Sequence, residues 1–314
     1  MMMRVLTIAV VLAAALWSGF WVLGARTVDQ ASEQLLDDAR TDGWQIAFAD
    51  RAVAGFPNRL DTTLTDLSVT TPDGLWSLSL PMLQVFALVY RPNQIIAVPA
   101  SPIAVMGPLG PAEILADQLR ASATLSLSTR PDLDRAVVEA TAAEIAGPDW
   151  RAGIEQGQAA LRQTDGSADH YDLALTLSQV RTTGLDPRLP DQITRLAADA
   201  TAGLTAPLAN GGRLQSLDLR SVVVDWDATR LTLTGKLEVA ASGLPEGTVT
   251  LTATGWRALI ALAQDMGLPA GQATLITAGL TGVERDGQVQ IPLTLRDGTL
   301  FFGTLALAPL PRLR

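Results

Sequence analysis

The chain opens with an apolar run and then changes to segments in which apolar and polar residues alternate. From Val5 to Leu23 there are nineteen residues without a charge, flanked by Arg4 and Arg26. With a helical rise of about 1.5 Å per residue, this run matches the roughly 30 Å hydrocarbon core of a bilayer. The pattern predicts an N-terminal transmembrane helix within residues 1–26.

A removable secretory signal is the alternative interpretation of this run. The run is longer than the roughly 7–15 apolar residues usual in signals, and Leu23 is a poor fit to a small-residue cleavage site near Ala25. Aromatic residues gather at its far end, as they do at membrane interfaces, and Arg4 favours a cytoplasmic N-terminus. We therefore expect a single-pass anchor in the inner membrane, with the bulk of the chain in the periplasm of a Gram-negative cell.

Beyond the anchor, the apolar spacing changes from helical to strand-like. Residues 27–43 have the spacing of a juxtamembrane helix, and from Trp44 the period is two, which is typical of half-buried strands. The alternation shifts midway through the strand expected at residues 60–69, which predicts a bend or bulge. Further strands are expected at residues 76–80, 82–90, 94–98, 103–106, 121–127, 135–145, 171–180, 217–226, 231–239, 248–254, 289–295 and 300–307.

Several segments have helical spacing instead. Residues 150–163 follow Asp149, which is a suitable N-cap, and residues 256–266 and 272–280 also read as helices. Residues 192–206 suit either a helix or a strand, and we favour a strand.

The clearest pattern lies between residues 213 and 254. Apolar residues occupy one face of successive strands and threonines occupy the other, as in an antiparallel meander with one buried face. The predicted fold class is mainly β (α+β), with antiparallel, strongly curved sheets and a few covering helices. This extracytoplasmic β-rich domain would span residues 44–314, with sub-sheets at 44–180 and 190–314.

The amino-acid composition argues against several classes of function. The net charge of −9, without a basic run, argues against nucleic-acid binding. The chain has no cysteine, which excludes disulfides, thiolate catalysis and cysteine-ligated metals. It has one histidine, His170, so a multi-histidine metal site is excluded and a Ser-His-Asp triad could form only there.

Acidic pairs and His170 are the remaining candidates for chemistry. His170 fits a solvent-facing position at a strand start, and Asp225 with Asp227 fits a polar hairpin end, although two carboxylates on one face could hold a metal. Asp132 and Asp134 flank a turn in the same way. We expect no catalytic residue, no metal site and no cofactor, and therefore no enzyme.

A few phrases resemble a known family. They are Gly55-Phe56-Pro57, Tyr90-Arg91-Pro92-Asn93, the strand around Gly235, Gly243-Leu-Pro-Glu-Gly247 and the closing segment from Asp297 to Pro309. Together they resemble an uncharacterised bacterial family of membrane-anchored extracytoplasmic proteins, a domain of unknown function. The pattern of strands separated by glycines is also remotely similar to that of AsmA-like envelope proteins. That resemblance implies a β-sheet groove for lipid.

The Tyr-Arg-Pro-Asn phrase is the best candidate ligand site. Arg91, next to a proline-fixed turn, could hold a phosphate or carboxylate, with Tyr90 and Asn93 beside it. Turn chemistry alone also explains this phrase.

We expect a non-enzymatic, membrane-anchored periplasmic protein that binds or passes lipid or acyl chains through an apolar β-sheet groove. Aromatic residues could line that groove, core packing being their alternative role: Phe56, Trp76 and Phe86. Residues 5–23 would bind the inner membrane, and the partner would be a lipid or an envelope protein. The first alternative is an envelope scaffold that binds a protein. The second alternative is a carboxylate-dependent envelope glycan enzyme.

Overall fold

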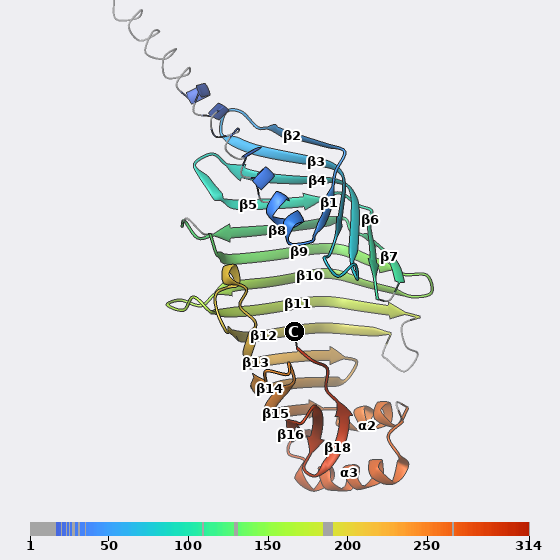
Figure 1. Cartoon of the computed structure of the whole chain (residues 1–314). Helices are drawn as coiled ribbons and strands as arrows, with labels where there is room; N and C mark the ends of the chain where they lie inside the picture. Colours follow the sequence, from blue (N-terminus) through green and yellow to red (C-terminus); the bar gives the residue numbers. More distant parts are fainter. Residues whose placement is uncertain are drawn as a thin grey trace, which may run out of the picture. The chain divides into compact units, whose positions relative to one another are not determined.

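The computed structural model describes most of the chain after the apolar run. Described are residues 17–19, 21–22, 24, 26, 29–30, 32–34, 36–108, 110–128, 131–184, 191–265 and 267–313. They form two compact units: unit 1 comprises residues 1–124 and 145–148, and unit 2 comprises residues 125–144 and 149–314. Antiparallel strands dominate both units, which confirms the predicted mainly β class (Figure 1).

Most of the predicted anchor lies outside the described residues, which begin at Trp17. Among the described residues, no helix combines the length and the apolar character needed to cross a membrane. Residues 29–30, 32–34 and 36–41 are helical, in agreement with the helix predicted at 27–43.

Unit 1 is built around the long ladder between β3 (Arg59–Thr70) and β4 (Ser77–Leu88). Two short strands share the outer edge of β3, and two more share the outer edge of β4. Its core gathers around Leu67, Leu80 and Ile103. The remaining strands are β1 (Gln45–Ala47), β2 (Asp50–Ala54), β5 (Arg91–Pro99), β6 (Ile103–Gly107), β7 (Gly110–Leu115) and β8 (Gln118–Leu125).

The bend predicted within residues 60–69 occurs at Asp66. This residue has a φ of 50°, and the pairing passes from Thr65–Met82 to Leu67–Leu80 around it. The sharp turn lets Leu64 and Leu67, which are three residues apart, pack against the same core. The strand predicted at 82–90 is too long, because Leu88 already pairs with Arg91 across a tight turn.

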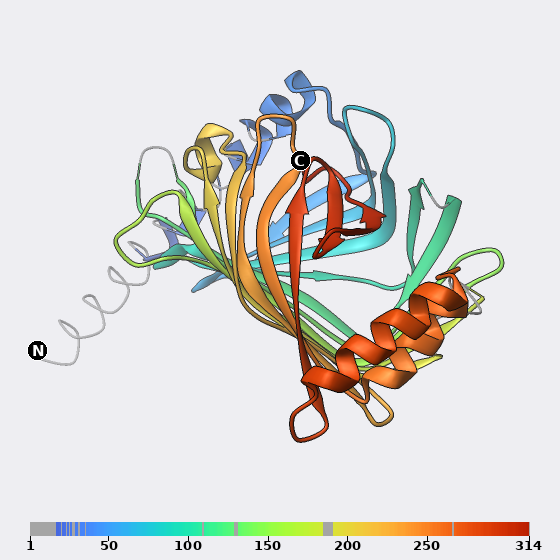
Figure 2. The ribbon, with the colours of Figure 1, turned by 90° about the horizontal axis from the view of Figure 1, so that it is seen from below.

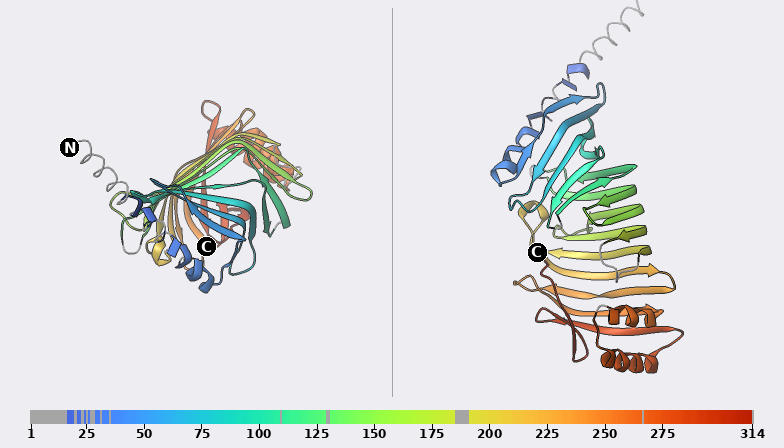
Figure 3. Two further views of the ribbon diagram at one scale, coloured as in Figure 1. Left: turned by 90° about the horizontal axis from the view of Figure 1, so that it is seen from above. Right: turned by 90° about the vertical axis from the view of Figure 1, so that its right-hand side faces the viewer.

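Unit 2 is a meander in which each strand pairs with the next along the chain (Figure 3). Helices α2 (Trp256–Asp265) and α3 (Ala270–Val283) lie between β15 and β16. The strands are β9 (Leu133–Ala146), β10 (Arg151–Gln163), β11 (His170–Thr183), β12 (Gln192–Leu204), β13 (Leu214–Trp226), β14 (Thr229–Val239), β15 (Pro245–Thr254), β16 (Gln288–Arg296), β17 (Thr299–Phe302) and β18 (Leu305–Pro309).

The strand register gives the meander one apolar and one polar face. Leu233 pairs with Leu251 on the apolar face, and Thr232 pairs with Thr252 on the other, as the alternation predicted. The pairing of β13 with β14 shifts register between Leu219 and Val222. Helices α2 and α3 and the β17–β18 hairpin cover the apolar face of β14–β16, and the orange strands curve around the red hairpin (Figure 2).

The helix predicted at residues 150–163 is wrong, because these residues form β10. Gly153 and Gly157 weaken a helix, and antiparallel pairing with β11 along nearly the whole segment outweighs the helical spacing of a few apolar residues. The strand favoured for residues 192–206 is confirmed as β12, which pairs with β11, so the 180–190 boundary between sub-sheets falls inside unit 2.

The strand predicted at residues 300–307 is also wrong as a single element. Gly303, with a φ of 59°, ends β17, and β18 turns back against it. Asp297 and Gly298 form the turn between β16 and β17. Helices α2 and α3 confirm those expected at 256–266 and 272–280.

Candidate functional site

Part of the apolar face of unit 2 remains partly exposed. On β10 and β11, Leu161 lies opposite Leu173, and on β11 and β12, Leu177 lies opposite Leu196. These side chains are partly exposed to solvent, whereas the same face of β14–β16 is buried under α2, α3 and the hairpin. We call the residues of this exposed region the open apolar face: Ala159, Leu161, Leu173, Leu175, Leu177, Leu196 and Ala198.

Gly157 leaves room for two apolar side chains beside this surface. A Cβ atom at this position would lie 2.6 Å from Cδ1 of Ile154 and 3.1 Å from Cδ2 of Leu177. Glycine therefore leaves the space into which these two apolar side chains extend.

A pocket of about 820 Å³ lies at one end of the meander in unit 2. The segment before β13, the end of β14 and the C-terminal tail meet there, and the Leu313 amide donates a hydrogen bond to Gly243 O at 2.7 Å. Its volume is in the range of small-molecule sites. We call it the end pocket, lined by Thr205, Gly212, Arg213, Leu214, Gln215, Val239, Ala240, Ala241, Gly243 and Leu313.

The end pocket is mostly apolar with one charge at its border. Val239 follows Leu237 in the alternation, so the pocket adjoins the part of the apolar face that the β17–β18 hairpin covers. Arg213 is exposed, and its guanidinium has no hydrogen bond or ion pair with any residue that the structure describes. An apolar cavity with a free guanidinium suits a ligand with a hydrocarbon part and an anionic group.

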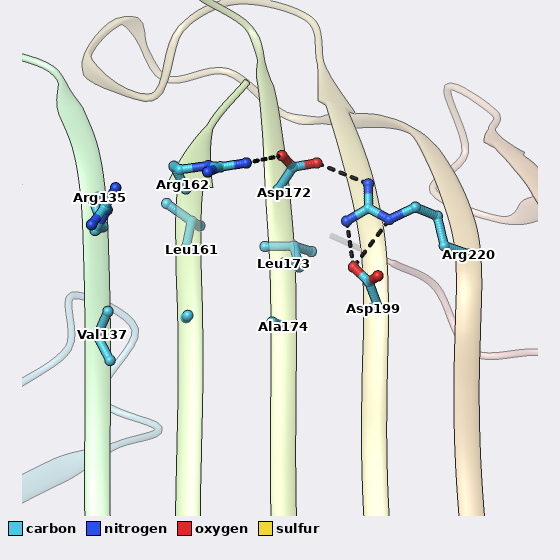
Figure 4. Close-up of a pocket in the computed structure, with 10 residues that line it drawn as sticks. Arg135, Val137, Leu161, Arg162, Asp172, Leu173, Ala174, Asp199 and Arg220 are labelled. Atoms are coloured by element: carbon cyan, nitrogen blue, oxygen red, sulfur yellow. Dashed lines mark hydrogen bonds and ion pairs between the residues drawn. The ribbon is translucent and has the colours of Figure 1, made fainter. Parts of the chain in front are cut away.

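A second hollow, of about 410 Å³, lies over a cluster of charged residues on β10–β13 (Figure 4). Asp172 accepts hydrogen bonds from Arg162 at 3.1 Å and from Arg220 at 2.9 Å. Arg220 Nε also donates to Asp199 at 3.0 Å. We call Arg162, Asp172, Asp199 and Arg220 the Arg–Asp cluster.

The cluster is electrically balanced. Hydrogen bonds from Arg220, Arg162 and Thr201 lower the pKa of Asp172 to about 2, and the carboxylates raise the pKa of Arg220. Asp172 is therefore ionised at neutral pH and fully engaged, which makes it a poor general acid or base. Sequence reasoning missed this cluster because its members come from four strands and share no local motif.

His170 does not form a catalytic triad. Ser167 Oγ lies 2.9 Å from His170 Nδ1, and Asp169 Oδ1 lies 2.8 Å from the same ring nitrogen. A triad needs the serine and the aspartate on opposite ring nitrogens. The Ser167 hydroxyl also donates to Asp169 at 2.7 Å, so these three residues satisfy one another within a loop.

One member of each acidic pair has structural partners. Arg230 Nε and Nη2 contact the two oxygens of Asp225 at 2.6 and 3.1 Å and lower its pKa, while Asp227 lies in the following turn with a φ of 47°. Asp132 accepts hydrogen bonds from the backbone amides of Leu133 and Ala209 at 2.9 and 3.2 Å. Within the described ranges, no group of three His, Asp or Glu residues is arranged to hold a metal ion.

The predicted ligand residues Tyr90, Arg91 and Asn93 lie around the β4–β5 turn. Tyr90 is 62% exposed in the turn itself, and Arg91 and Asn93 belong to the start of β5, where Arg91 is exposed. The structure therefore places them together at one strand end, on a surface of unit 1. The predicted proline-fixed turn is wrong, because Val89 and Tyr90 form the turn and Pro92 lies in β5.

The predicted groove aromatics occupy different surroundings in unit 1. The Phe56 ring meets the Trp21 ring edge-on at 5.6 Å, and the Arg59 guanidinium lies 5.4 Å from the Phe86 ring centre. Trp76 instead packs over Gly107, where a Cβ atom would lie 2.4 Å from its ring. Among the described residues, no ring contact joins Trp76 to Phe56 or Phe86.

Comparison with known proteins gives one result. A family model described as "Uncharacterized protein conserved in bacteria" matches residues 21–311, nearly the whole described chain. No curated protein and no solved structure matches the chain.

Proposed function

From the premise that this chain belongs to the bacterial family DUF2125, we propose that it is a membrane-anchored periplasmic protein that binds an acyl chain without catalysis. The ligand lies in the end pocket and along the adjoining apolar face of unit 2. The observation that carries the proposal is the end pocket, an apolar cavity of about 820 Å³ with the exposed Arg213 at its border.

Burial of hydrocarbon supplies the binding energy. Each methylene removed from water contributes about 0.8 kcal/mol, so burial of roughly ten or more methylenes of an acyl chain is needed to offset the cost of association. The partly exposed leucines of the open apolar face provide a second apolar surface in the same unit. Arg213 would pair with the carboxylate or phosphate at the polar end of the ligand.

Binding of a fluorescent fatty acid to the full-length protein in mild detergent tests this proposal. We expect saturable binding that unlabelled fatty acid displaces, and co-purified lipid in native mass spectra. Ala241→Trp, which places a large ring in the end pocket, should reduce affinity by about tenfold or more, because the ring takes up the volume that the chain needs.

A charge reversal provides a second arm with a matched control. Arg213→Glu should weaken binding, whereas Arg285→Glu, a reversal at an exposed arginine between α3 and β16, should leave it unchanged. Absence of saturable binding, or equal binding by the Ala241→Trp variant, would contradict the proposal.

A further inference from the structure

The N-terminal segment of unit 1 is held against loops at one end of the β3–β4 pair (Figure 1). Trp17 Nε1 donates a hydrogen bond to Pro57 O at 2.7 Å, and Trp21 Nε1 donates to Arg59 O at 2.8 Å. Further along the helix, Arg51 of β2 pairs with Asp29 at 2.8 Å. The described end of the charge-free run is therefore fixed to the sheet at Trp17 and Trp21.

Large apolar side chains are exposed at this same end. Phe56 is 56% exposed in the β2–β3 loop and Tyr90 is 62% exposed in the β4–β5 turn, although polar residues dominate most loops. The Val89 amide donates to Asn58 O at 3.1 Å and so ties the loop to the turn. We call Trp17, Trp21, Phe56 and Tyr90 the aromatic end of unit 1.

The composition of the aromatic end favours a lipid surface over a second protein. Trp and Tyr prefer the headgroup layer of a bilayer, where their rings are apolar and their polar atoms stay hydrated. Arg91 is exposed beside Tyr90, and arginine near a bilayer is attracted to anionic headgroups. Trp17 and Trp21 belong to the charge-free run of residues 5–23, so a membrane that holds this run is within reach of Phe56 and Tyr90.

We propose that the aromatic end of unit 1 docks on the bilayer surface around the anchor, with Phe56 and Tyr90 at headgroup depth. The docking gives the chain a second contact with the membrane in addition to the anchor. This inference rests on the anchor in the proposed function and is independent of acyl-chain binding by unit 2.

The absence of cysteine makes a site-specific test direct. Phe56→Cys and Tyr90→Cys are introduced separately into the full-length chain, labelled with an environment-sensitive fluorophore, and reconstituted into phosphatidylethanolamine–phosphatidylglycerol vesicles. Leu75→Cys is the matched control, because Leu75 is 58% exposed and lies at the opposite end of the β3–β4 pair.

Labels at positions 56 and 90 should show a blue shift in emission, quenching by nitroxide-bearing lipid, and loss of quenching by aqueous iodide. The label at position 75 should show none of these changes.

Two outcomes would overturn the inference. The first is iodide quenching at positions 56 and 90 equal to that at position 75. The second is shielding of these labels from both quenchers, which would indicate a contact with protein. A chain that stays outside the vesicles would refute the anchor together with the docking, while the fatty-acid assay would still test unit 2.

Discussion

At the residue scale, the Arg–Asp cluster illustrates how charges on neighbouring strands stabilise a solvent-facing sheet surface. Asp172 accepts hydrogen bonds from Arg162 of β10, Arg220 of β13 and Thr201 of β12, so one carboxylate links strands on both of its sides. Such exposed pairs contribute modestly because water screens them. The shared carboxylate nevertheless makes the stability of unit 2 sensitive to acid.

The pH dependence follows from the sign of the shift. The pKa of Asp172 falls from 3.8 to about 2 on folding, so its stabilisation is present above pH 3.8 and disappears as the pH falls toward 2. Asp172→Asn should lower the free energy of unfolding by about 1 kcal/mol at neutral pH. Urea unfolding should show a smaller difference between variant and wild type at pH 2 than at pH 7.

Asp265→Asn, at the exposed end of α2, is the control and should leave this pH dependence unchanged. An equal difference between Asp172→Asn and wild type at both pH values would show that ionisation of Asp172 does not contribute.

At the element scale, the C-terminal elements determine which part of the apolar face is buried. Trp256 and Leu280 are 1% and 3% exposed, and they pack with Val289 over the sheet. The hairpin adds Leu300 and Phe302 against Leu293 and its neighbours. The covered half supplies the core of unit 2, which leaves the open apolar face free for another role.

Truncation of the central side chain of that core measures its contribution. Trp256→Ala should lower the free energy of unfolding by about 3–5 kcal/mol, because it leaves a large cavity between α2 and the sheet. Leu275→Ala on α3 is the control: Leu275 is 75% exposed, and the expected change is within about 0.5 kcal/mol. Similar urea midpoints for the two variants would contradict the assignment of α2 as part of the core.

At the scale of the whole molecule, the chain forms two compact units. Unit 1 has a core around Leu67, Leu80 and Ile103, and unit 2 has its own cores around Leu293 and Trp256. The chain has no cysteine, so apolar burial in these cores has to stabilise the fold without disulfides.

Fractionation of cells tests the proposed location of the units. The full-length chain should stay with the inner membrane after washes with salt and with alkaline carbonate and should be released by detergent, because a membrane-spanning helix is not extracted by charge screening. Protease added to spheroplasts should digest both units. Recovery of the intact chain in the cytosol would contradict the anchor and the periplasmic location.

The sequence by itself determined the features that depend on local pattern. Period-two alternation predicted β13, β14 and β15 and their two faces, and the loss of phase within residues 60–69 predicted the bend at Asp66. These follow from the contacts of each residue with its own strand and its nearest partners.

Only the tertiary structure decided features that depend on strands far apart in the chain. Pairing with β11 makes residues 151–163 a strand despite their helical spacing. The Arg–Asp cluster draws its members from β10 to β13, and the end pocket brings Leu313 beside Gly243. The physical reason is that local sequence fixes which face a side chain takes, whereas the register and the covering elements fix what that face meets.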